Sequence, residues 1–407
     1  MSKEKRRVPK LRFPGFTEDW EQHKLNDFVT IRRGLTYKPS DIAENGIRVL
    51  RSSNIDEDQF IKSNDDVFVN LAAVNIPFAK NGDILITSAN GSNRLVGKHT
   101  IINDIAENSA VPGGFMLLAE SNNPLFTDAL LSSNWYKRFI NTYVAGGNGA
   151  IGNLSKSDLE SQSVMVPSEY EQTKIGQWYD NINQLITLHQ RKLEHLNLKK
   201  KALLQKLFPK NGERYPEFRF PGFTDAWEQR KLGSILIEYT EKNPGNENLP
   251  VLTSSRQGLT KQEDHFGSVQ RHDISDYNVI PLGFCTYRNR SDDKTFTFNI
   301  NRIVPRGLVS KFYPVFEIKN GNADFITEYL NNNTEIIKSL VINAVGTSQV
   351  VLSLRTLKNI EITLPLKAEQ VAIGNLMRKL DIYITLHQRK LEHLQLQKKA
   401  LLQQMFV

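Results

Sequence analysis

The sequence predicts an α+β protein in which two globular mixed α/β domains, in a pseudo-twofold arrangement, are joined by two long antiparallel coiled-coil helices. Three observations support this prediction. A short opening segment occurs twice in the 407 residues, a closing segment with helical periodicity also occurs twice, and each pair encloses short β-type runs mixed with helical runs. The length suits two or three domains, and a hydrophobic content of 39% is ample for packed cores.

The repeated segments frame each half of the chain. The opening segment reads PKLRFPGFTEDWEQHKL at 9–25 and PEFRFPGFTDAWEQRKL at 216–232. The closing segment reads ITLHQRKLEHL at both Ile186–Leu196 and Ile384–Leu394. The interiors share little visible similarity, which favours one scaffold used twice around two different surfaces. Simple duplication followed by drift predicts differences spread along the whole length instead.

These frames divide the chain into four segments. The first contains the opening segment and a globular domain, the second is a long central helix, and the third and fourth repeat that order. Their predicted bounds are 1–166, 167–209, 210–365 and 366–407.

The closing segments predict the long helices. Ser168 is placed to be the N-cap of the first, with Glu171 completing a capping box. No proline follows until Pro209, so the helix can run for about 40 residues, or roughly 60 Å. Apolar residues spaced by three and four predict one seam along each helix. The seam residues are Ile182, Ile186, His189, Leu193, Leu196, Leu203 and Leu207, and Leu380, Ile384, His387, Leu391, Leu394, Leu401 and Met405.

Each seam would be unstable alone in water, so the two helices are expected to pair with each other. Antiparallel pairing is favoured because parallel pairing would bring Lys200 close to Lys398 and His189 close to His387. Polar residues at seam positions often fix the register of a coiled coil, and we interpret these four in that way. A pH switch or a metal site at the two histidines is the less favoured interpretation.

The interiors predict short strands and one longer helix in each half. The helices are predicted from Leu125 to Val144 and from Phe325 to Val341. The predicted strands are 47–50, 83–87 and 164–166 in the first half, and 250–253, 279–280, 284–287 and 360–364 in the second.

The net charge of +8 lies entirely in the two long helical segments. Residues 169–210 carry eight basic and four acidic groups, and residues 367–407 carry seven and three, so the rest of the chain is balanced. A basic helix end can simply be solvated and complement the helix dipole, or it can attract a polyanion. Both interpretations stay open on the sequence alone.

No catalytic or metal site is visible in the sequence. The single cysteine, Cys285, excludes a disulfide framework and a cysteine-based zinc site. The pattern G-x-G-x-x-G at 147–152 lacks the strand–helix context of a dinucleotide site. Asn123-Pro124-Leu125-Phe126 resembles the Asn-Pro-Pro-aromatic motif of DNA adenine methyltransferases but lacks its second proline. We therefore expect neither catalysis nor a cofactor in this chain.

No secretory or membrane-spanning segment is recognisable, so we expect a cytoplasmic protein. Polar and basic residues instead gather in loops after the predicted strands. Arginine, asparagine and serine side chains can pair with base edges, and lysine suits phosphates. The predicted DNA-contacting residues are Arg51, Ser52, Asn54, Ser88, Asn90, Ser92, Asn93, Arg94 and Lys98 in the first half, and Arg256, Gln257, Arg288, Asn289, Arg290, Lys311, Thr347 and Ser348 in the second.

The whole chain resembles a specificity subunit of a type I restriction–modification system. The opening segments with L-R-F-P-G-F or F-R-F-P-G-F followed by W-E-Q-x-K-L carry the resemblance, as do the helices that contain K-K-A-L-L-Q. Residues 46–55 resemble the entry to a first recognition domain and 277–287 a segment of a second one, in which Leu282 stands where an acidic residue is expected.

The resemblance implies that each domain recognises one half of a bipartite, asymmetric site in double-stranded DNA. It also implies that the helices act as a spacer and that the chain binds two methyltransferase (modification) subunits and the restriction/translocase subunits. Those partners would bind S-adenosylmethionine, ATP and Mg, and this chain would be a non-catalytic subunit without membrane attachment.

Three other interpretations stay open. The chain could be the specificity subunit of a fused restriction–methylation (type IIB-like) system, which neighbouring genes would distinguish. It could be a coiled-coil scaffold whose duplicated domains bind proteins, in which case salt would have little effect on duplex binding. It could also be a methyltransferase or nuclease that acts alone, which a labelled methyl-transfer assay on the purified chain would detect.

Overall fold

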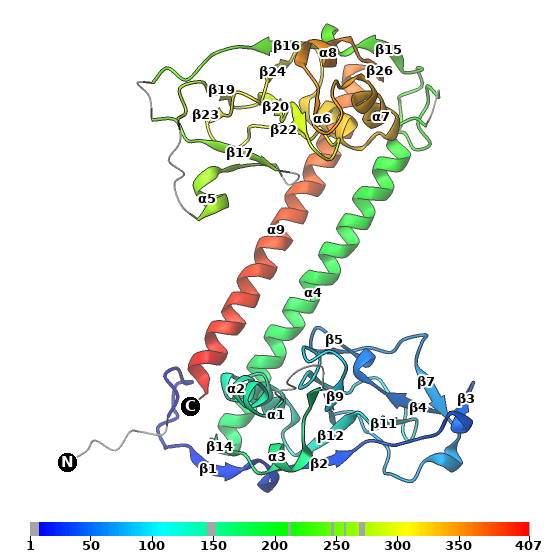
Figure 1. Cartoon of the computed structure of the whole chain (residues 1–407), viewed down its shortest axis with the longest axis vertical. Helices are drawn as coiled ribbons and strands as arrows, with labels where there is room; N and C mark the ends of the chain where they lie inside the picture. Colours follow the sequence, from blue (N-terminus) through cyan, green and yellow to red (C-terminus); the bar gives the residue numbers. More distant parts are fainter. Residues whose placement is uncertain are drawn as a thin grey trace, which may run out of the picture. The chain divides into compact units, whose positions relative to one another are not determined.

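The computed structural model describes residues 8–144, 152–210, 213–245, 248–255, 258–267 and 273–406. The chain forms two compact units (Figure 1). Unit 1 contains residues 1–190 and 390–407, and unit 2 contains residues 191–389. Each of the two long helices therefore begins in one unit and ends in the other.

Unit 1 is built on two four-stranded sheets. One has the strand order β10-β8-β12-β2 and is antiparallel throughout, and the other has the order β11-β4-β7-β3 with β11 and β4 parallel. Side chains of the central strand β8 alternate between two clusters, with Ile84 and Ile86 in one and Leu85 in the other, as the two-residue period of a strand requires. The strands of unit 1 are β1 Glu21–Lys24, β2 Val29–Arg33, β3 Ile42–Ala43, β4 Ile47–Leu50, β5 Ile55–Asp56, β6 Gln59–Phe60, β7 Val67–Val69, β8 Ile84–Thr87, β9 Ala89–Asn90, β10 His99–Ile101, β11 Ala110–Pro112, β12 Met116–Ser121, β13 Gly152–Asn153 and β14 Ser163–Val166.

The short helices of unit 1 are α1 (Pro124–Leu131), α2 (Asn134–Tyr143) and α3 (Lys156–Glu160). The prediction of a single helix over 125–144 is wrong, because the helix is interrupted at Ser132 and Ser133 between α1 and α2. Ser132 accepts a 2.6 Å hydrogen bond from Tyr179 Oη, so the break is tied to the long helix beside it.

Unit 2 is built on one four-stranded antiparallel sheet with the order β16-β24-β20-β22, and it also contains separate two-stranded sheets. Its strands are β15 Glu228–Lys231, β16 Leu236–Tyr239, β17 Leu252–Ser255, β18 Gly258–Lys261, β19 Asn278–Pro281, β20 Cys285–Tyr287, β21 Arg290–Ser291, β22 Phe298–Ile300, β23 Arg306–Val309, β24 Val315–Ile318, β25 Val350–Val351 and β26 Glu361–Leu364. Its short helices are α5 Gln262–Phe266, α6 Ala323–Asn332, α7 Thr334–Asn343 and α8 Leu354–Asn359.

The helix predicted over 325–341 is also two helices, α6 and α7. Asn333 separates them, because its side-chain oxygen accepts from the backbone N–H groups of Glu335 (3.1 Å) and Ile336 (3.0 Å) and so caps the second helix. Both units thus have a pair of short helices where the sequence predicts one.

The opening segment of each unit is fixed by the same two contacts. A short strand in it pairs with the last strand of the interior, β1 with β14 in unit 1 and β15 with β26 in unit 2. An arginine then forms a two-point ion pair with a fully buried glutamate in the first turn of a long helix. Arg12 reaches Glu171 with both contacts at 2.7 Å, and Arg219 reaches Glu369 at 2.8 and 2.6 Å. Glu171 is therefore the partner of the opening segment, a role that the predicted capping box does not include.

The long helices are α4 (Glu169–Leu207) and α9 (Lys367–Met405). In unit 1, Ile175 and Tyr179 near the start of α4 share one apolar cluster with Leu402 and Met405 at the end of α9. Since the start of one helix packs where the other ends, the two run in opposite directions, as the sequence predicts (Figure 1). Unit 2 contains the reverse combination, the end of α4 with the start of α9.

The predicted seam residues all lie on the covered sides of α4 and α9, and none is exposed. Ile182, Ile186, Leu196, Leu207, Leu380, Leu391, Leu394 and Met405 are buried, and His189, Leu193, Leu203, Ile384, His387 and Leu401 are half-buried. Near the end of α9, Leu402 is more deeply buried than the predicted seam residue Leu401, so the buried face of the helix is shifted by one residue there.

Candidate nucleic-acid interface

Two loops that the sequence predicts to contact DNA meet in unit 1. Arg51 and Ser52 follow β4, and Asn90 lies on the short strand β9. The Asn90 side-chain amide donates to Ser52 Oγ at 3.1 Å, which joins the two loops although they are separated by 38 residues. The guanidinium of Arg51 donates to Asp65 O at 2.8 Å through Nη2, while its buried Nε has no hydrogen-bond partner among the described residues.

These side chains border a cavity of about 640 Å³ on unit 1, which we name the β4–β9 cavity. Its other walls are mostly apolar. They include Phe115, whose side chain is 70% exposed, and no carboxylate borders the cavity in the described part of the chain. The lining residues are Leu35, Thr36, Tyr37, Pro39, Ile42, Val49, Arg51, Ser52, Ala89, Asn90, Gly91, Gly113, Gly114, Phe115 and Met116. Hydrogen-bonding side chains beside an apolar wall can pair with the edge of a nucleobase while the wall packs against its face.

The loop after β9 carries the remaining predicted residues of this half. Ser92, Asn93 and Arg94 are exposed, and the Ser92 N–H donates to Asn90 Oδ1 at 2.9 Å, which shapes the turn. Arg94 and Lys98 line a second cavity of about 740 Å³, which we name the α9 cavity.

The α9 cavity is predominantly cationic. Five of its lining residues are lysine or arginine: Arg94, Lys98, Lys137, Lys398 and Lys399. Its two acids already have partners, because Glu57 accepts from Gln190 (2.6 Å) and Asp58 lies 3.3 Å from Lys398 Nζ. An anion is the ligand that this balance of charge favours.

Two predicted residues of unit 1 have a structural role instead. Asn54 is fully buried, and its amide donates to Ile61 O (3.0 Å) and Asp66 Oδ1 (2.7 Å) while its oxygen accepts from Arg51 N. These bonds hold the turn after β4 and leave the side chain no face for a base, so the predicted DNA contact of Asn54 is wrong. Ser88 is also buried, and its backbone N–H donates to Phe115 O.

In unit 2 the predicted residues gather around Phe312. Arg288, Asn289 and Arg290 follow β20, and the Arg290 guanidinium lies over the Phe312 ring at 4.2 Å from its centroid. Lys311 is 5.9 Å from the same centroid and pairs with Asp276 at 2.7 Å. The side-chain oxygen of Asn289 is buried and has no partner among the described residues.

The other predicted residues of unit 2 do not join this cluster by any contact that the structure records. Thr347 and Ser348 are exposed in the loop between α7 and β25. Arg256 and Gln257 lie outside the described residues, as do all but the last residue of the G-x-G-x-x-G pattern, Gly152.

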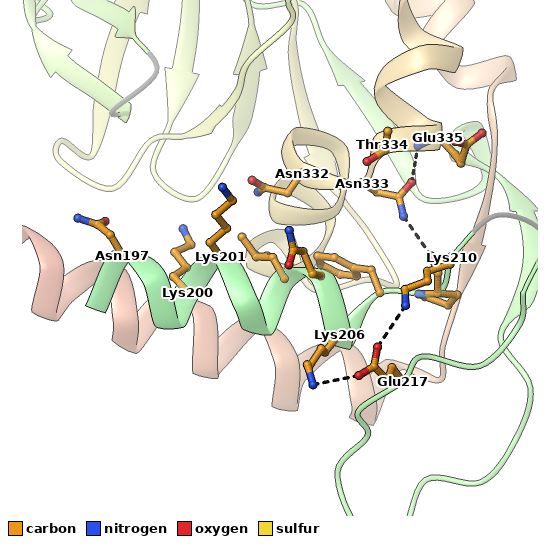
Figure 2. A pocket seen from close by; sticks show the side chains of 14 residues that line it. Asn197, Lys200, Lys201, Lys206, Lys210, Glu217, Asn332, Asn333, Thr334 and Glu335 are labelled. Carbon is orange, nitrogen blue, oxygen red and sulfur yellow. Dashed lines mark hydrogen bonds and ion pairs between the residues drawn. The ribbon is translucent and has the colours of Figure 1, made fainter. Parts of the chain in front are cut away.

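Unit 2 has a cavity at the helix positions that correspond to the α9 cavity. The residues Lys200 and Lys201 of α4 border this α4 cavity of about 720 Å³, as their repeat equivalents Lys398 and Lys399 border the first. Figure 2 shows that Lys206 and Lys210 both point toward Glu217, with contacts of 3.0 and 3.2 Å. The remaining lining residues are Asn197, Leu204, Gln205, Phe208, Pro209, Asn332, Asn333, Thr334 and Glu335.

Lys200, which interrupts the seam, is held by two carboxylates. Its Nζ lies 2.9 Å from Glu328 on α6 and 2.6 Å from Asp381 on α9. Burial alone would lower the pKa of Lys200, but these two acids reverse the effect and hold its pKa above the usual 10.5. The lysine thus stays charged and ties the end of α4 to α6 and α9 within unit 2.

Cys285 and Asn123, two residues considered for catalytic chemistry in the sequence, have structural positions. Cys285 is fully buried, and burial raises the pKa of its thiol to about 12. Asn123 of the methyltransferase-like tetrapeptide caps α1, its side chain accepting from Phe126 N at 3.3 Å. Across the described ranges, no cluster of three or more histidine, cysteine or acidic residues is placed to bind a metal ion, and no helix has the length and apolarity to cross a membrane.

Comparison with known proteins finds a matching family model and two similar specificity subunits. The family model of the type I restriction modification DNA specificity domain matches residues 17–198 and 294–396, together more than half of the chain. The putative type I restriction enzyme MjaX specificity subunit of Methanocaldococcus jannaschii is 23% identical over 420 residues, covering 95% of this chain and 92% of that protein. The MjaVIII specificity subunit of the same organism is 24% identical over 198 residues, covering 47% of this chain and 45% of its own.

A solved structure has the same fold. The type I restriction–modification system S subunit from M. genitalium superposes with a TM-score of 0.62 at 14% identity, covering 98% of this chain and 99% of that one. The family model matches the chain in two places, and the structure has two units. The chain belongs to the type I restriction modification DNA specificity family.

Proposed function

We propose that this chain is the specificity subunit of a type I restriction–modification complex, in which each unit recognises one half of a bipartite, asymmetric DNA site. The observation that carries the proposal is one frame around two different surfaces. Both units have the arginine–glutamate pair and the paired opening strand, but unit 1 presents Ser52 and Asn90 where unit 2 presents Arg290. Two different sets of candidate base-contacting residues on equivalent frames suit a DNA site whose two halves differ in sequence.

Two other interpretations of the sequence have less support. A fused restriction–methylation system and a protein-binding scaffold both allow duplicated domains and paired helices. Family membership and the relative that matches over nearly the whole chain favour the type I system over both.

The proposal gives the catalytic steps to other polypeptides. Two modification subunits would bind S-adenosylmethionine and methylate the site, and restriction/translocase subunits would use ATP and Mg. Exposed leucines at equal positions of the repeated helices support two equivalent docking faces. Leu188 and Leu386 are 61% and 59% exposed, and Leu198 and Leu396 are 61% and 67% exposed.

The cationic cavities supply contacts that do not depend on sequence. Lysine and arginine beside a groove neutralise phosphates and position a duplex without reading it. In this proposal, Lys399 of the α9 cavity and Lys201 of the α4 cavity contact the DNA backbone, while the loops around Asn90 and Asn289 contact bases.

Methylome sequencing tests the proposal. A host that expresses this chain with its modification subunit should show adenine methylation at one bipartite sequence with a fixed gap, and a host without this chain should not. A matched deletion then tests the spacer role, because His189–His195 and His387–His393 have the same sequence. Removing both heptads keeps the seams in phase. The gap should become shorter with both half-sequences unchanged, whereas altered half-sequences with the same gap would contradict the spacer role.

A further inference from the structure

Phe115 is a large apolar side chain displayed to solvent at the edge of the β4–β9 cavity. It is 70% exposed and follows two glycines in the turn that leads into β12. An isolated exposed apolar residue is common on protein surfaces. This one stands beside Arg51, Ser52 and Asn90, the polar residues that the sequence predicts to contact DNA.

The backbone under this ring is fixed. The carbonyl oxygen of Phe115 accepts two hydrogen bonds, from the N–H groups of Ser88 (2.9 Å) and Ala89 (3.1 Å). The next residue, Met116, donates to Gly113 O at 2.8 Å and closes the turn. A fixed backbone leaves the ring only the rotations of its own side chain, which lowers the entropic cost of ordering it against a ligand.

Unit 2 contains an aromatic residue in the corresponding place. The carbonyl oxygen of Phe312 accepts from Asn289 N at 2.9 Å just before β21, as that of Phe115 accepts from Ser88 N just before β9. Phe115 directly precedes β12, whereas the half-buried Phe312 lies three residues before β24. The interiors have otherwise diverged, so the repetition argues for a shared function. Phe312 differs in carrying the Arg290 guanidinium on its face.

Each aromatic ring is accompanied by a polar group that lacks a partner. In unit 1 it is Arg51 Nε, and in unit 2 it is the side-chain oxygen of Asn289. Both atoms are buried without a hydrogen bond in the described part of the chain, so a small side-chain rotation toward a new partner is favourable. An apolar ring, an arginine and an amide together suit a nucleobase, which offers a flat face and hydrogen-bonding edges.

We propose that Phe115 and Phe312 are the base-stacking residues of the two recognition surfaces, each inserting its ring partly into a base step of its own half-site. This inference rests on the proposed function in DNA recognition. Apolar side chains that insert in this way unstack the step and bend the duplex, which adds specificity at that position. Phe312 inserts together with the stacked Arg290, whereas the ring of Phe115 inserts alone.

The test uses the full chain in complex with its modification subunit and a duplex that contains the methylated site. The adenine analogue 2-aminopurine is placed in turn in each step of each half-site, because its fluorescence rises when it is unstacked. Because a methyltransferase flips its target adenine out of the stack, that position is left out of the comparison. Wild-type complex should raise the signal at one other step in each half-site. Phe115→Ala should abolish the signal in the first half-site only and weaken specific binding about 10-fold. Phe115→Trp should preserve both.

The matched variant Phe312→Ala should affect the second half-site only. Failure of the wild-type complex to prefer this duplex over an unrelated one contradicts the proposed function itself. Preference without a 2-aminopurine signal at any step apart from the target adenine overturns the insertion and leaves the function standing. Equal weakening of specific and unrelated duplexes by Phe115→Ala also overturns it. The wild-type signal needs no variant, so poor folding of a substituted chain does not affect that outcome.

Discussion

Arg12 and Glu171 form a two-point ion pair across 159 residues of sequence, and the glutamate is fully buried. Arg219 and Glu369 repeat it in unit 2. The pair joins the opening segment of a unit to the first turn of its long helix. This contact explains why the opening and closing segments stay alike while the interiors between them diverge.

Arg12→Ala should destabilise the protein strongly. The substitution leaves the Glu171 carboxylate buried without its cation, a change that costs about 3 kcal/mol or more. Denaturant unfolding measures the loss, and Arg219→Ala should give a similar one. The exposed Arg33→Ala serves as control. Adding Glu171→Gln to Arg12→Ala should recover part of the stability. A loss below about 1 kcal/mol for Arg12→Ala would show that the pair matters little.

Stability should depend on pH through Asp128. Burial raises its pKa from 3.8 to about 6, with His99 3.5 Å away. The folded protein therefore binds more protons than the unfolded chain between about pH 4 and pH 6. The stability that this group contributes is complete below about pH 4 and is lost as the pH rises through 6.

Asp128→Asn removes the titrating group, so it should flatten the pH dependence and raise the free energy of unfolding at pH 8 by up to about 3 kcal/mol. Chemical denaturation at pH 4, 6 and 8 measures both effects. Asp104→Asn is the control, since Lys62 lowers the pKa of that exposed residue and its effect on stability therefore has the opposite sign. An unchanged slope in Asp128→Asn would show that Asp128 is not the source.

Leu188→Arg and Leu386→Arg should each remove one modification subunit. Both leucines are exposed at equal positions of the repeated helices, so charge there opposes an apolar interface without disturbing the seam. The mass of the assembled complex should fall by one subunit in each single variant and by two in the double variant. Gln397→Arg, also exposed on α9, is the control. Full assembly of the double variant would exclude this docking face.

Lys399→Ala and Lys201→Ala should weaken binding to specific and unrelated duplexes alike. Each removes one proposed phosphate contact, so the slope of log affinity against log salt should become shallower by about 0.9 per substitution. Lys206→Ala is a control from the same α4 cavity, because Lys206 already pairs with Glu217. A loss confined to the specific duplex would assign these lysines to base recognition instead.

Periodicity was sufficient to predict the long helices, because seven-residue spacing is a local signal. Their antiparallel direction was predicted from the polar seam residues, since a parallel pair would bring Lys200 close to Lys398. Periodicity could not locate the break between α6 and α7, which two capping bonds to Asn333 mark, nor the break at Ser132–Ser133, where Ser132 accepts from Tyr179 of the long helix. The apolar spacing continues across both breaks. The Arg12–Glu171 pair has no local signal either. Its only trace in the sequence is that both residues recur in the second half, as Arg219 and Glu369.

The candidate site could be predicted in part. Residue type and position after a strand located Arg51, Ser52 and Asn90, which the structure brings to one cavity. Residue type could not separate them from Asn54, whose amide is used up inside the turn. Phe115 was missed because Gly-Gly-Phe-Met-Leu-Leu reads as the start of a buried strand, and only the geometry of the turn displays the ring.

Replacing residues 26–165 with the corresponding interior of a relative tests the central claim most directly, because it exchanges one surface and keeps both frames. Methylome sequencing of a host that expresses the hybrid with the modification subunit should show a new first half-sequence beside the original second half-sequence, at the original gap. A hybrid that changes both half-sequences, or neither, would contradict the account of two independent recognition units on one scaffold.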